Sequence, residues 1–203
     1  MLSLRFAVTR FGRHRVANIS SVAKAATGSR VCALSILNEH KAFLRGLNDA
    51  VYTFYSPLVE GSVGQHTRHS LDHISKPLEM LSATKEEGSA CLVHYDVRDR
   101  STRVEKDRHA AIEQIEHLEK LVCIVPQSNL ARPVYASFML SADGDEIDFK
   151  STFSRELAFA VHHFIHHNAL SKVLLRQHFP ETSLPEGFGM APSTANCNVI
   201  QNE

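Results

Sequence analysis

The sequence lacks the features that mark several large classes of protein. Its 203 residues contain no run of 18 apolar residues, so we expect no membrane-spanning helix and no membrane partner. The 22 Lys and Arg residues balance the 22 Asp and Glu residues, and this zero net charge argues against a general nucleic-acid binder. The four cysteines never take C-x-x-C spacing, so neither a zinc ribbon nor a disulfide scaffold is indicated. What remains is the composition of a globular protein, with 43% hydrophobic residues.

Charge is distributed unevenly along the chain, because residues 1–38 hold six basic residues and no acidic one. The rest of the chain therefore holds all 22 acidic residues and is net acidic. The first segment is also rich in Ser and Ala, a composition typical of organellar transit peptides. We predict that residues 1–32 form a disordered targeting presequence, for the mitochondrion in preference to the plastid. The alternative is a solvated basic tail on a cytoplasmic protein.

Four stretches of the remaining chain repeat their apolar residues at the spacing of an amphipathic helix. This pattern predicts helices over residues 33–55, 63–76, 104–122 and 154–177. Ser62 and Ser154 are suited to cap the second and fourth helices, and Pro77 is expected to bend or end the second.

The connections between the predicted helices differ in character. Residues 85–103 are polar and indicate a long loop, whereas residues 180–203 carry Pro and Gly and indicate an extended tail. Between the third and fourth helices, Val134–Leu140 and Ile147–Phe149 flank an Asp-Gly turn signal, which predicts a β-hairpin. We therefore expect residues 33–203 to form an all-α four-helix bundle. Its long connection before the last helix can include this hairpin.

Histidine is the residue that stands out, with 13 copies. The predicted fourth helix carries two pairs at i, i+4 spacing, His162 with His166 and His163 with His167. This spacing puts both imidazoles of a pair on one helical face, one turn apart, as two ligands of a single metal ion require. The face of the second pair also carries larger apolar residues, namely Phe159, Leu170 and Leu174. These neighbours favour His163 and His167 as the buried pair.

The predicted second helix carries a further stripe, His66, His69 and His73, at i, i+3, i+7 spacing. One of them is suited to supply a third ligand, and three neutral imidazoles with an open fourth position are typical of catalytic metal sites. The alternatives are hydrogen-bonded core histidines and histidines clustered at the surface. A zinc-protease site is excluded because these helices lack the H-E-x-x-H motif. Asp72 and Glu156 are candidates either for orienting an imidazole or for ordinary salt bridges.

Six segments, in order along residues 35–195, carry a resemblance to a known family. They are S-V-G-Q-H-T-R-H-S-L-D-H at 62–73, Y-D-V-R-D-R at 95–100, E-K-D-R at 105–108, R-E-L-A-F at 155–159, H-H-F-I-H-H-N-A-L at 162–170 and G-F-G-M-A-P-S-T at 187–194. On these motifs the chain resembles the DinB-like (YfiT-like) superfamily of metal-dependent four-helix-bundle proteins. The resemblance implies an up-down four-helix bundle with a long connection before the last helix. It also implies a divalent metal held by three histidines, one from the second helix and two from the last.

Carried over to this sequence, the resemblance implies the ligands His69, His163 and His167. His66 is the other candidate on the second helix. The candidates for partners of these ligands are Asp72, Glu156, His66, His73, His162 and His166.

The resemblance also implies a function. Characterised members of the superfamily include thiol-dependent transferases and an isomerase, so we expect a metal-dependent enzyme for thiol transfer, hydrolysis or isomerisation of a small molecule. Three imidazoles suit Zn, Ni or Fe, and a low-molecular-weight thiol is a second implied cofactor. A homodimer is a further expectation. The alternative is a non-catalytic metal-binding or structural helical bundle.

Overall fold

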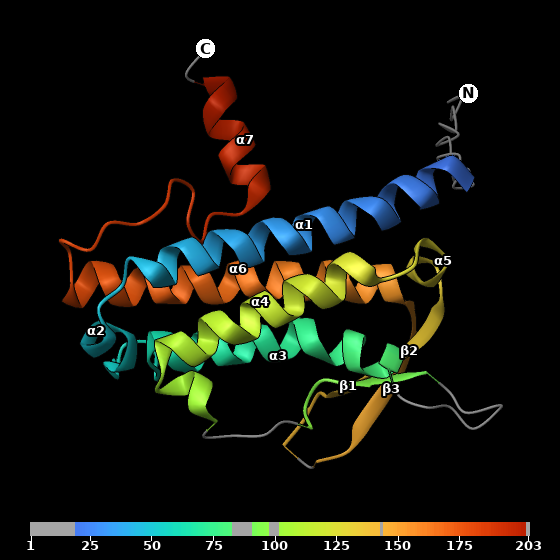
Figure 1. Ribbon diagram of the computed structural model, residues 1–203, viewed down its shortest axis with the longest axis horizontal. Helices are drawn as coiled ribbons and strands as arrows, with labels where there is room; N and C mark the ends of the chain where they lie inside the picture. The colour runs from blue at the N-terminus through green and yellow to red at the C-terminus, as the bar shows by residue number, and fades with distance from the viewer. Residues whose placement is uncertain (1–18, 83–90, 98–101, 143, 202–203) are drawn as a thin grey trace, which may run out of the picture.

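The protein is described by a computed structural model over residues 19–82, 91–97, 102–142 and 144–201 (Figure 1). The predicted presequence lies partly outside these residues, and residues 19–32 form the start of the first helix. Within the described residues, no helix combines the length and apolar character that crossing a membrane requires.

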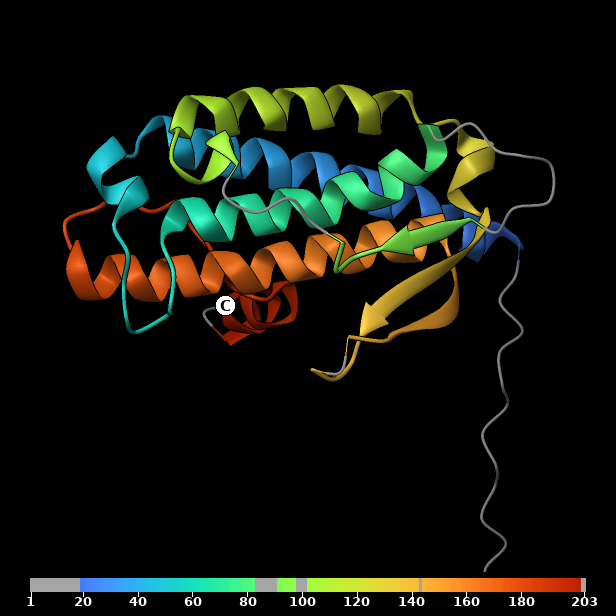
Figure 2. The same cartoon turned by 90° about the horizontal axis from the view of Figure 1, so that it is seen from below.

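The structure is mostly helical, as predicted, and its four long helices lie side by side (Figures 1 and 2). They are α1 (Ile19–Arg45), α3 (Val63–Ser82), α4 (Arg108–Ile124) and α6 (Phe153–His178). Helices α4 and α6 each pack against both α1 and α3. The core between them is apolar and includes the buried residues Leu37, Leu44, Leu71, Ile115, Leu157 and Phe164.

The helix ends follow local capping chemistry. Ser62 caps α3 as predicted: its Oγ accepts a hydrogen bond from the Gln65 backbone N–H, and its own N–H donates to Gln65 Oε1, at 3.1 and 3.0 Å. Of the two expected effects of Pro77, a bend or an end, the end is wrong, because the helix continues to Ser82. Ile74 and Leu78 are buried on either side of the proline, so packing offsets the lost hydrogen bond. The predicted cap Ser154 is also wrong, since Thr152 caps α6.

The predicted first helix, residues 33–55, is two helices in the structure. Helix α1 ends at Arg45, and a separate short helix α2 (Asp49–Thr53) is capped by the side chain of Asn48. Tyr52 of α2 is buried and donates its hydroxyl to the Val104 carbonyl at 2.6 Å. The apolar spacing continues across the turn, which is why periodicity alone did not separate the two helices.

A small sheet packs against α3 and α6 at one end of the long helices (Figure 2). Its order is β1 (Leu92–His94), β2 (Pro133–Met139), β3 (Glu146–Thr152), with β1 parallel and β3 antiparallel to β2. The hairpin of β2 and β3 confirms the prediction. Strand β1 was missed, because three residues inside a polar stretch are too short to show an alternating pattern.

The prediction of an extended C-terminal tail is wrong for its last part, which forms helix α7 (Pro192–Gln201). This helix projects from the long helices (Figure 1). The segment before α7 approaches α6 closely at Gly189. A Cβ placed there would lie 2.6 Å from the backbone nitrogen of Ala169, and φ is +67°. Only glycine suits both conditions. The remaining short elements are η1 (Arg103–Glu105) and α5 (Gln127–Leu130).

Candidate metal centre

Three histidines from the two adjacent helices α3 and α6 converge on one point. His69 Nε2 lies 2.8 Å from His163 Nε2, which in turn lies 3.1 Å from His167 Nε2. One ligand atom from each of the three residues lies within 4.8 Å of the others. The structure therefore brings together the three histidines that the sequence singled out.

The geometry of these nitrogens suits a metal ion. With metal–nitrogen distances of about 2.0–2.1 Å, the ligand nitrogens of a tetrahedral ion lie about 3.3 Å apart. Two imidazole nitrogens at hydrogen-bond distance need one N–H and one lone pair. His163 Nε2 makes two such contacts, but an imidazole nitrogen has either one proton or one lone pair, so it cannot serve both fully. A cation would instead accept a lone pair from each ring.

The charge state of the cluster also suits a ligand set. Burial lowers the pKa of His167 to about 3, with further lowering by the neighbouring histidines, His163 first among them. Burial, and then His166, lower the pKa of His66. Neutral imidazole is the form that binds metals, so His167 is in its binding form at neutral pH.

Two further histidines of α3 hold the rings of the cluster. His66 Nδ1 lies 3.1 Å from His167 Nδ1, which directs the Nε2 of His167 toward the other two rings. His73 stacks on His163 at 4.0 Å between ring centroids, and its Nδ1 lies 3.1 Å from the His69 carbonyl oxygen. His66 was predicted as a partner of the ligands, and its position agrees with that role.

Glu156 is fully buried, and it is linked to the histidine cluster through Tyr95. It accepts hydrogen bonds from the Tyr95 hydroxyl at 3.0 Å, from Arg155 at 2.8 Å and from Ser151. Tyr95 in turn stacks on His73 at 5.1 Å. Burial, and then Glu156, raise the pKa of Tyr95, so its hydroxyl stays protonated and donates. Glu156 therefore anchors Tyr95, which packs on the ring that supports His163.

The other candidates lie nearer the surface. Asp72 forms an ion pair with Arg68 at 2.8 Å, the salt-bridge alternative considered from the sequence. His166 is exposed, with its ring 5.2 Å from that of His167, and His162 is exposed as well. Tyr95 was missed, because it follows the unpredicted strand β1; its only signal was its place at the start of the Y-D-V segment.

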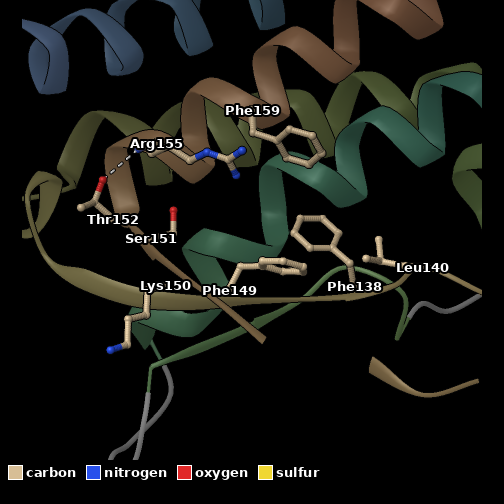
Figure 3. A pocket seen from close by; sticks show the side chains of 8 residues that line it. All are labelled: Phe138, Leu140, Phe149, Lys150, Ser151, Thr152, Arg155 and Phe159. Carbon is tan, nitrogen blue, oxygen red and sulfur yellow. Dashed lines mark hydrogen bonds between the residues drawn. The ribbon is translucent and has the colours of Figure 1, made fainter. Parts of the chain in front are cut away.

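A pocket of about 820 Å³ lies next to the cluster, between the β2–β3 hairpin and the start of α6 (Figure 3). Its lining residues are Phe138, Leu140, Phe149, Lys150, Ser151, Thr152, Arg155 and Phe159. The ring of Phe159 stacks on His163 with centroids 5.8 Å apart. One aromatic ring therefore separates the pocket from the histidine cluster.

Comparison with known proteins gives a partial match. No family model matches the chain, and no solved structure matches it. Among curated proteins, the chain is 36% identical over 104 residues to FK506-binding protein 5 of Rhizopus delemar. The aligned residues make up 51% of this chain and 26% of that protein, so the chain matches only about a quarter of the relative's length.

Proposed function

We propose that the protein is a metal-dependent enzyme of the DinB-like superfamily, in which His69, His163 and His167 bind one divalent transition metal. The convergence of their three Nε2 atoms is the observation that carries the proposal. The side-by-side packing of α1, α3, α4 and α6 is consistent with the up-down four-helix bundle that this superfamily implies.

The proposed chemistry follows from the ligand set. Three imidazole ligands leave a fourth coordination position open. A bound Zn, Ni or Fe ion would lower the pKa of a water or a low-molecular-weight thiol in that position. The chain itself orients the ligands, through the contact of His66 with His167 and the stacking of His73 on His163. Phe159 stacks on His163 on the side of the pocket.

The substrate class in this proposal is a small molecule, for thiol transfer, hydrolysis or isomerisation. The mitochondrial location and the homodimer remain predictions from the sequence. The Rhizopus relative is named for binding FK506, and FK506 is one ligand to include in a screen.

A non-catalytic metal-binding protein is the second candidate. It is favoured by Phe159, because the ring of this residue stands between the pocket and His163. Turnover distinguishes the two candidates. Metal-loaded protein that consumes a thiol or an electrophile supports the enzyme, whereas stoichiometric metal without turnover of any screened substrate favours the alternative.

The test is elemental analysis of the full chain, purified without a histidine tag. The variant H163A/H167A removes two proposed ligands, and H162A/H166A is its matched control, with the same helix, spacing and substitution on exposed residues. We expect about one equivalent of transition metal in the parent and the control, and loss in H163A/H167A with helical content unchanged by circular dichroism. Absence of metal from the reconstituted parent, or equal loss in the control, would contradict the proposal.

A further inference from the structure

The hairpin exposes apolar side chains on both of its faces, and one group of them lies near the pocket beside α6. Leu140 is 66% exposed, Phe149 44% and Ile147 49%. In the register of the hairpin, Phe138 pairs with Ile147 and Ala136 with Phe149, so these side chains share one face of the sheet. Large side chains gathered beside a hollow, and not scattered singly, are typical of a binding surface.

The pocket has the size and lining of a small-molecule site. Its volume of about 820 Å³ lies within the range of about 300–1,000 Å³ that such sites occupy. Phe138, Phe149 and Phe159 supply flat apolar walls, and Figure 3 shows their rings around one space. An occupant with an apolar body would cover surface that water now contacts.

The charged groups of the pocket are cationic. Its lining includes Arg155 and Lys150 and no acidic residue. The Arg155 guanidinium lies over the Phe159 ring, 5.4 Å from its centroid, and 60% of the side chain is exposed. Glu156, its partner, is fully buried behind it and already accepts from Tyr95 and Ser151.

The two cations are placed differently. Figure 3 shows the Arg155 guanidinium next to Phe159, over the aromatic walls, whereas the Lys150 ammonium turns away from the rings. An occupant stacked on Phe159 would therefore meet Arg155. The planar fork of a guanidinium matches a carboxylate or a sulfonate.

We propose that this pocket binds a small molecule with an apolar body and one anionic group, which Arg155 pairs with. The binding needs only the hairpin and the start of α6, so it goes beyond the metal centre and does not depend on it. The occupant lies against Phe159, whose ring stacks on His163.

The experiment measures fluorescence of 8-anilinonaphthalene-1-sulfonate, an aromatic anion, on the metal-free full chain, followed by displacement with decanoate or decanol. These competitors share an apolar chain and differ in charge. We expect one probe molecule per chain, and we expect decanoate to displace it about tenfold more effectively than decanol does, which is the effect of one charged hydrogen-bonded pair.

The variant R155Q should abolish this preference for decanoate, whereas K150Q should keep it. F149A, at an exposed wall, should weaken both competitors by a similar factor.

The alternatives give different results. Equal displacement by decanoate and decanol, or equal effects of R155Q and K150Q, would overturn the proposal. If sedimentation shows that the chain self-associates and the probe is released as it does so, the apolar surface binds a second copy of the chain instead. H163A/H167A should keep the anion preference, and its loss there would place the anion at the histidines. If the chain binds no metal but shows the anion preference, the proposed function fails and this inference stands.

Discussion

The two histidine pairs of α6 lie on one helix with the same i, i+4 spacing, yet one pair faces α3 and the other is exposed. His163 and His167 turn toward α3, where His69 meets them at hydrogen-bond distance and His66 contacts the far nitrogen of His167. His162 and His166 are exposed. The i, i+4 spacing therefore offers two nitrogens to a metal, but the facing helix decides which pair has a third ligand.

The largest expected effect comes from removing that third ligand. H69F should lower zinc affinity by more than about 100-fold, beyond the roughly 10- to 100-fold cost of losing an outer partner. Competition titration with a chromophoric chelator measures the affinity. H162F, a matched substitution on the exposed face, should leave it unchanged, and a similar loss in both variants would remove the distinction between the two pairs.

The comparison of the two pairs also depends on the position of α3, which carries His69, and a second variant is designed to disturb the packing of this helix. A Cβ on Gly64 would lie 2.1 Å from the Glu105 carbonyl oxygen, a backbone atom that has little room to shift. G64A should destabilise the fold by about 3 kcal/mol, as severe overpacking does. Urea unfolding gives the free energy. G28A is the control, because nothing lies within 4 Å of its new Cβ, and there alanine should stabilise α1 by up to about 1 kcal/mol.

The smallest effect is a pH dependence of stability that comes from a buried histidine, His40. Burial lowers the pKa of His40 to about 3 in the folded protein, against an ordinary value of 6.5. Between these values the unfolded chain binds a proton that the folded chain does not. The contribution of His40 to the free energy of unfolding is therefore fully present above pH 6.5. It falls on acidification toward pH 3, by up to about 1.4 kcal/mol per pH unit.

Unfolding of the metal-free chain in urea between pH 7 and 5 measures this slope. H40F should flatten it by that amount, since phenylalanine takes up no proton and keeps an aromatic ring among Phe43, Phe164 and Phe188. An unchanged slope in H40F would show that His40 takes up its proton in the folded state.

The features predicted well from the sequence are those with a local physical signal. The apolar period located the long helices, Ser62 as an N-cap marked the start of α3, and the apolar residues beside His163 and His167 identified the inward pair. The hairpin followed from its turn residues. The metal itself remains a prediction.

The features that sequence reasoning missed depend on contacts between distant segments. Strand β1 exists because it pairs with β2, some 40 residues away, and Tyr95 gains its role from Glu156 and His73. The continuation of α3 beyond Pro77 depends on the burial of Leu78. The pocket arises where the hairpin meets α6, which no single segment reveals.

The most direct test of the metal centre is anomalous diffraction at the zinc edge from crystals of the zinc-loaded full chain. The account predicts one strong peak about 2.0–2.1 Å from the Nε2 atoms of His69, His163 and His167. A peak only at the exposed pair His162 and His166, or no peak in protein shown to be fully loaded, would contradict it.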